Sequence, residues 1–87
     1  QQGVATNLNA IGVVYETLAN YNNFENFSEA LKYYSQAKDI QNKTGNKIEE
    51  AKSIGNIGNI YSQMYGYYQN QLNASDNYSF NQKDSLI

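Results

Sequence analysis

The stretch that decides the fold is Leu8-Asn9-Ala10-Ile11-Gly12-Val13-Val14-Tyr15, which returns 46 residues later as Ile54-Gly55-Asn56-Ile57-Gly58-Asn59-Ile60-Tyr61. In both copies two aliphatic residues, a glycine, a third aliphatic residue and a tyrosine hold the same places. The agreement extends upstream, where Ala5 corresponds to Ala51. A period of this length in a short chain predicts two copies of one supersecondary unit that pack side by side.

Apolar residues recur every three or four positions in and around both copies. The first series is Val4, Leu8, Ile11, Tyr15 and Leu18; a second runs from Ala51 to Tyr65, and a third lies between them from Phe27 to Ile40. This spacing places an apolar stripe along one side of a helix and differs from the alternation of a strand. It predicts helices at 3–20, 27–44 and 47–65, then a weaker helix within 74–87, and no strand.

Capping residues and glycines predict where these helices begin and end. Asn26 and Asn46 each precede a glutamate by three residues, the spacing of a capping box at a helix N-terminus. Gly45 is placed as a left-handed residue that ends the second helix. Gly66 is expected to end the third, with Tyr67 or Tyr68 packing at the turn that follows.

The two copies, together with Ala30-x-x-x-Tyr34-x-x-Ala37, resemble the tetratricopeptide repeat signature. That family repeats every 34 residues or so, and the longer period here is similar to a variant of about 40 residues found in Leu-Gly-Asn adaptors and kinesin light chains. The resemblance implies an all-α fold, an α-solenoid of antiparallel helix pairs of which this chain is a fragment. The first pair would span 3–46, with a loop insertion near 20–26, and the second 47–87, with a degenerate or capping last helix.

The glycines on the apolar stripes are the part of this resemblance that concerns helix packing. Gly12 and Gly58 hold equivalent places, where small residues let two helices cross closely while larger side chains fill the gaps around them. A larger side chain at Gly58 is therefore expected to overpack such a crossing and destabilise the chain.

The composition argues against several classes of function. The chain has 87 residues, a net charge of −2 and only six Lys or Arg, so it lacks the basic cluster that nucleic acids and anionic membranes require. Neither His nor Cys is present, which removes thiol chemistry and the usual zinc sites. No apolar run approaches the roughly 18 residues of a membrane span. We therefore expect no catalysis, cofactor, nucleic acid, membrane or small-molecule substrate for this segment.

The resemblance implies instead a groove lined by the first helix of each repeat. The candidate groove residues lie on the faces turned away from the apolar stripes: Asn9, Val13, Glu16, Lys52, Asn56, Asn59 and Gln63. An asparagine amide both donates and accepts hydrogen bonds, so a row of them can hold the backbone of an extended peptide. An ordinary solvated face in a chain rich in asparagine is the alternative interpretation.

Protein–protein interaction, as a scaffold or adaptor, is the function that the resemblance implies. The expected partners are a peptide or helix of another protein, or neighbouring subunits of a complex, and the expected location is the cytoplasm. Two alternatives stay open: a regulatory array within a larger signalling enzyme, and a structural component of a cytoskeletal or ciliary assembly.

Overall fold

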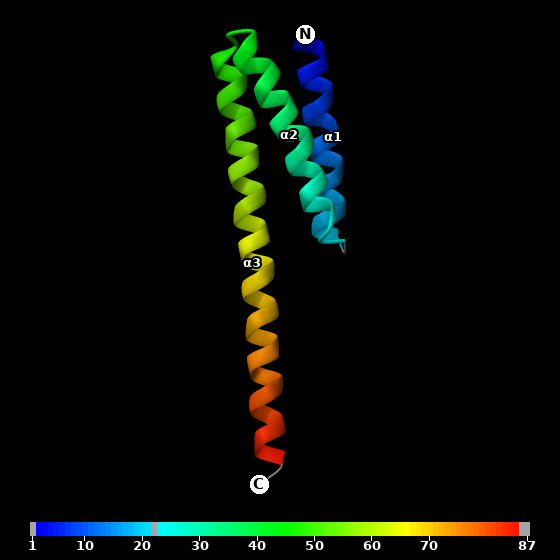
Figure 1. Cartoon of the computed structure of the whole chain (residues 1–87). Helices are drawn as coiled ribbons and strands as arrows, with labels where there is room; N and C mark the ends of the chain where they lie inside the picture. The colour runs from blue at the N-terminus through cyan, green and yellow to red at the C-terminus, as the bar shows by residue number, and fades with distance from the viewer. Residues whose placement is uncertain (1, 22, 86–87) are drawn as a thin grey trace.

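Three α-helices make up the computed structural model, which describes the backbone of residues 2–21 and 23–85 and the side chains of residues 3–21 and 23–74. Helix α1 spans Gln2–Tyr21, α2 spans Asn26–Lys43 and α3 spans Lys47–Ser85. Helices α1 and α2 form an antiparallel hairpin, and α3 turns back along α2 (Figure 1). The predicted all-α class is confirmed, and the described residues contain no strand.

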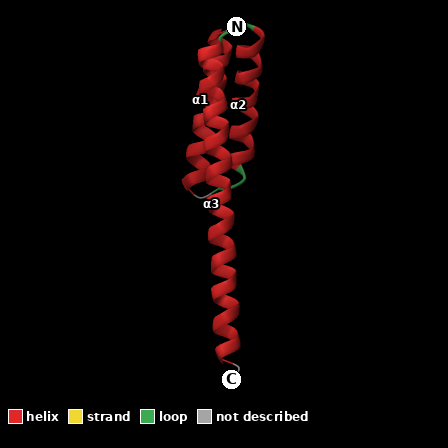
Figure 2. Ribbon diagram, turned by 90° about the vertical axis from the view of Figure 1, so that its left-hand side faces the viewer, coloured by secondary structure: helices red, strands yellow, loops and turns green. Residues whose placement is uncertain are grey.

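The predicted end of the third helix at Gly66 is wrong. Helix α3 continues through Gly66 to Ser85, so residues 47–85 form one helix where the sequence predicts a pair. Helices α1 and α2 lie beside its first half, and its second half extends well beyond them (Figure 2). The molecule therefore measures 65 × 19 × 12 Å.

An aromatic contact explains why α3 does not stop at this glycine. A glycine inside a helix costs only about 1 kcal/mol relative to alanine, which a tertiary contact can offset. Phe24, in the loop between α1 and α2, stacks on Tyr67 with ring centroids 4.2 Å apart and contacts Tyr68 edge-on at 5.1 Å. These contacts hold the turn of α3 that follows Gly66 against the loop.

The turn between α2 and α3 has the predicted geometry. Gly45 adopts a φ of 75°, the left-handed conformation that favours glycine. The Asn46 amide donates to the Gln41 carbonyl at 2.9 Å, which completes a Schellman turn at the end of α2. The Asn46 side chain then accepts a hydrogen bond from the Glu49 amide at 3.4 Å, so its role as the cap of α3 is confirmed.

The predicted cap at Asn26 is wrong. Asn26 is already the first residue of α2, Glu25 precedes it in a helical conformation, and no side chain caps the helix. Backbone carbonyls of the preceding turn accept the first free amide protons instead: Asn26 to Asn23, Phe27 to Phe24 and Ser28 to Glu25, at 3.0–3.2 Å. Because these amides are satisfied locally, a side-chain cap is not needed.

Helix α2 lies between the other two helices and supplies most of the core. Its Phe27, Ala30 and Tyr34 are buried together with Ala19 of α1 and Ile60 of α3. Helix α1 meets the large α2 side chains with its smallest residues, which are Ala5, Gly12 and Ala19. The predicted stripe of α1 is only partly covered: Tyr15 packs against the core, whereas Val4, Ile11 and Leu18 are exposed.

Helices α1 and α2 cross closely at Gly12. The close crossing that the sequence predicts at Gly58 does not occur among the described residues, so this prediction is wrong. A Cβ atom added at Gly12 would lie 2.6 Å from Cε1 of Tyr34. A Cβ atom added at Gly58 would meet nothing within 4 Å. The difference arises because α2 packs against opposite parts of the two repeat copies.

The two copies of the repeat are covered on complementary faces. Ala5, Gly12 and Ala19 are buried in the first copy, while their counterparts Ala51, Gly58 and Tyr65 are exposed in the second. Conversely, Ser53 and Ile60 are buried in the second copy, while their counterparts Asn7 and Val14 are exposed in the first. Each repeat helix thus carries two faces that are able to pack against another helix.

Candidate functional site

A line of polar side chains joins α1 to α3 along one side of the molecule; we call it the α1–α3 seam. At one end, Asn9 of α1 donates to the Ser53 hydroxyl of α3 at 3.2 Å, and this hydroxyl donates to Gln41 of α2 at 2.6 Å. Ser53 and Gln41 are both buried. A side-chain amide is tolerated in the interior only when its polar atoms form hydrogen bonds. This series of hydrogen bonds therefore fixes the relative position of the three helices.

Glu16 forms the second bridge of the seam. One carboxylate oxygen accepts from the Tyr34 hydroxyl at 2.7 Å, and the other accepts from the Gln63 amide at 2.8 Å. Asn20 donates to the Gln63 side-chain oxygen from one turn further along α1. Burial, together with the hydrogen bond and the negative charge of Glu16, raises the pKa of Tyr34 above its usual range. The phenol therefore stays protonated and keeps its role as a donor.

Three predicted groove residues lie on this seam. Asn9, Glu16 and Gln63 are engaged in the interhelical hydrogen bonds described above, which the sequence pattern did not predict. Asn56 is half-buried, whereas Val13 and Asn59 are exposed. Lys52 is paired with Glu49 of its own helix at 3.1 Å.

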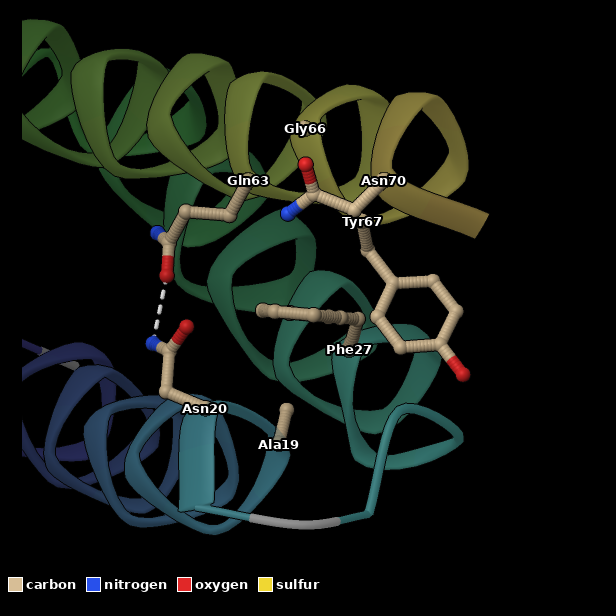
Figure 3. Close-up of a pocket in the computed structure, with 7 residues that line it drawn as sticks. All are labelled: Ala19, Asn20, Phe27, Gln63, Gly66, Tyr67 and Asn70. Carbon is tan, nitrogen blue, oxygen red and sulfur yellow. Dashed lines mark hydrogen bonds between the residues drawn. The ribbon is translucent and has the colours of Figure 1, made fainter. Parts of the chain in front are cut away.

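An open cavity of about 320 Å³ lies at the end of the seam, where α1 stops and α3 continues (Figure 3). Its lining residues come from all three helices: Ala19, Asn20, Phe27, Gln63, Gly66, Tyr67 and Asn70. Gly66 lines one wall without a side chain, and a Cβ atom there would meet nothing within 4 Å. The Asn20–Gln63 hydrogen bond closes the seam side of the cavity.

The interior of this cavity is apolar, and side-chain amides surround it. Phe27 and Ala19 are buried in the core below it, and the ring of Tyr67 stands beside Phe27. Asn20, Gln63 and Asn70 bring three side-chain amides to it, and no charged residue lines it. Such a cavity suits an apolar side chain whose flanking peptide groups need hydrogen-bond partners, because the Asn70 amide can both donate and accept. The amide nitrogens of Asn20 and Gln63 already donate within the molecule, so Asn20 offers its side-chain oxygen as an acceptor.

Phe24 packs against two aromatic residues that line the cavity, Phe27 and Tyr67. Phe24 packs edge-on against Phe27 at 5.5 Å and stacks on Tyr67. Tyr67 and Tyr68 also contact each other at 6.1 Å. Packing of these tyrosines is thus observed, although their partner is the loop before α2 and not a helix turn after Gly66.

Only Gln63 of the cavity residues belongs to the predicted groove. The other cavity residues of α3 could have been recognised from their spacing. Gly66, Tyr67 and Asn70 follow Gln63 at helical spacing and therefore share one side of α3 with it. The sequence pattern placed the end of the helix at Gly66 and so concealed this continuity. The contribution of Phe27 and Ala19 depends on tertiary packing.

Comparisons with protein-family models, with curated proteins and with solved structures found no significant match to this chain. Among the described residues, no group of three or more acidic, His or Cys side chains is arranged to hold a metal ion. No described helix combines the length and hydropathy that crossing a bilayer requires. The geometry of the seam and its cavity is therefore the basis on which a function can be inferred for this chain.

Proposed function

We propose that this chain is a protein-interaction module of the tetratricopeptide type, in which the α1–α3 seam and its terminal cavity bind an extended segment of a partner protein. The cavity between Asn20, Gln63 and Asn70 is the observation that carries this proposal. It receives one apolar side chain, while the Asn70 amide and the side-chain oxygen of Asn20 bond to the backbone of the same segment. The proposal assigns no catalytic step to this segment and includes a cytoplasmic location.

The chemistry of the seam favours a protein ligand over a charged one. Lys52 is the one basic residue among the predicted groove positions, and it is already paired with Glu49. Glu16 is satisfied by Tyr34 and Gln63, so it offers little to an incoming cation. A ligand recognised by uncharged amides and an apolar cavity is a peptide segment with a large apolar residue and few charges.

The two-faced repeat supports the solenoid part of the proposal. Helix α3 packs on α2 through Ser53 and Ile60, and the equivalent face of α1, with Val14, is exposed. A helix like α2 from a preceding repeat fits that face, because the same residue positions accept α2 on α3. In such an array the seam between successive first helices continues from one repeat to the next.

Selection from a library of short random peptides against the immobilised chain tests the proposal. The selected peptides are expected to share an aromatic or large aliphatic residue. In NMR titrations they should shift the side-chain amide signals of Asn20, Gln63 and Asn70, which report on the cavity directly. A typical hydrogen bond contributes about 0.5–1.5 kcal/mol net, so the loss of one amide should weaken binding by about 2- to 12-fold.

Gly66→Leu is the decisive variant, because it fills the cavity from the α3 wall and replaces glycine by a better helix former. We expect binding to fall at least tenfold while the helical content stays unchanged. Gly3→Leu is the matched control, since Gly3 is also a helical glycine with nothing within 4 Å and does not line the cavity. Peptides that bind the Gly66→Leu variant as tightly as the original chain would contradict the proposed site.

A further inference from the structure

A second surface lies on α3, on a different face from Ser53 and Ile60. Six residues follow each other there at spacings of four, three, four, three and four; we call them the α3 stripe: Ile54, Gly58, Tyr61, Tyr65, Tyr68 and Leu72. This is the spacing of a coiled-coil seam. The five large side chains are between 52% and 67% exposed, so the described residues leave the stripe largely uncovered.

The side chains of the stripe are complementary in size to the same stripe in the reverse direction. When two copies of α3 lie antiparallel about a twofold axis near Gln63, Ile54 faces Leu72 of the other copy. Gly58 then faces Tyr68, and Tyr61 faces Tyr65. Each tyrosine ring therefore faces either a second tyrosine, with which it can stack, or the open space above a glycine.

A glycine that accepts a tyrosine across an antiparallel helix pair already occurs within the chain. Gly12 of α1 receives the ring of Tyr34 of α2, with Cε1 2.6 Å from the place of a Cβ atom. Gly58 is the repeat counterpart of Gly12, and no atom lies within 4 Å of the place of its own Cβ. The backbone at Gly58 is thus helical and open, which a second tyrosine-bearing helix requires.

Charge does not oppose the contact. No Asp, Glu, Lys or Arg occurs from Ser53 to Ser75, so like charges would not meet along the paired segments. The residues beside the stripe include Gly55 and Ser62, which are small and let two helices approach closely. The helix backbone of residues 73–85 does not fold back over the stripe, because it continues α3 in the same direction.

We propose that the α3 stripe is a homodimerisation surface, on which α3 of a second copy packs antiparallel with Gly58 opposite Tyr68. Three tyrosines on each copy, each with about 150–250 Å² of surface and more than half of it exposed, contribute roughly 700 Å², and Ile54 and Leu72 bring the buried area to roughly 1,000 Å². This lies at the low end for specific interfaces, so association is expected at micromolar concentration. The surface is independent of the peptide-binding seam and does not depend on the function proposed for it.

Sedimentation equilibrium on the full 87-residue chain, from low micromolar to millimolar concentration, tests for the dimer. Disulfide trapping tests its direction, and the chain has no cysteine of its own to interfere. In an oxidised mixture of Ile54→Cys and Leu72→Cys chains, the mixed disulfide should dominate, and neither variant alone should crosslink efficiently. A chain that stays monomeric throughout, or an Ile54→Cys variant that crosslinks with itself, would overturn the proposal.

A size exchange tests the pairing of Gly58 with Tyr68. Gly58→Phe should weaken the dimer at least tenfold, because its ring collides with Tyr68 of the partner copy. Adding Tyr68→Ala in the same chain should restore association, and Tyr68→Ala alone corrects for the lost contact with Phe24. Circular dichroism of each variant should show unchanged helix content. A dimer that tolerates Gly58→Phe, or one that the second change fails to restore, would refute the antiparallel register.

Discussion

The substitution Gly12→Ala makes the most direct test of the packing between α1 and α2. In the middle of a helix, alanine is favoured over glycine by about 1 kcal/mol. The new methyl group, however, would lie 2.6 and 2.7 Å from two carbons of the Tyr34 ring. Ordinary contacts between carbon atoms lie near 3.5–4.0 Å, so the ring or the helix must move by most of an ångström.

Tyr34 has little room to move. Its side chain is buried, and its hydroxyl is bonded to Glu16 at 2.7 Å. Overpacking of this kind costs about 1–3 kcal/mol, which exceeds the gain in helix propensity over most of its range. We expect a net loss of about 1 kcal/mol of unfolding free energy, which lowers the Tm by roughly 4–8 °C in a domain of this size.

Thermal and urea unfolding followed by circular dichroism would measure this loss. Gly55→Ala is the control, because Gly55 lies inside α3 with nothing within 4 Å and should gain about 0.5–1 kcal/mol. A double-mutant cycle with Tyr34→Leu should show that the cost at Gly12 disappears once the ring is removed. If Gly12→Ala raises the Tm as much as Gly55→Ala does, the close contact of Gly12 with Tyr34 is not one that stabilises the chain.

Two further predictions concern the loop and the seam. Phe24→Ala should lower the free energy of unfolding by about 1–3 kcal/mol, because it removes stacking on Tyr67 and edge contacts with Phe27 and Tyr68. Amide hydrogen exchange should then become faster in α3 from Gly66 onward. Unchanged exchange there would contradict the role of this contact in extending α3. For Tyr34, whose folded-state pKa is raised, the stabilising contribution is complete below the usual pKa of about 10 and is lost as the pH rises from there through the higher folded-state pKa. Tyr34→Phe should therefore be less stable near neutral pH, and its stability should fall less steeply above about pH 10 than that of the original chain, as urea titrations at each pH would show.

Local signals were sufficient to predict much of the fold. The spacing of apolar residues predicted all three helices, and the starts of α1, α2 and α3 agree with the structure within one residue. Gly45 and Asn46 predicted the turn between α2 and α3, since a left-handed residue and an N-cap side chain are recognised by their immediate neighbours alone. The repeat predicted that Gly12 and Gly58 lie in equivalent parts of equivalent helices.

Tertiary contacts decided what these signals left open. Whether a glycine ends a helix depends on what packs around it, and at Gly66 the contact of Phe24 with Tyr67 outweighs a cost of about 1 kcal/mol. The same holds for the predicted groove, where Asn9, Glu16 and Gln63 found partners on neighbouring helices. A polar residue on a helix face has the same pattern in sequence whether it meets water or another amide.

The sequence by itself therefore determined that this chain is helical, where its helices begin and that two of them are copies of one unit. Only the tertiary structure decided which face of each copy is covered. The Tyr34 ring fills the space beside Gly12, whereas the space beside Gly58 is open, although the residues around both glycines are nearly the same. The physical reason is that local spacing fixes the direction of each side chain around its own helix, while burial depends on a second helix that is distant in the sequence.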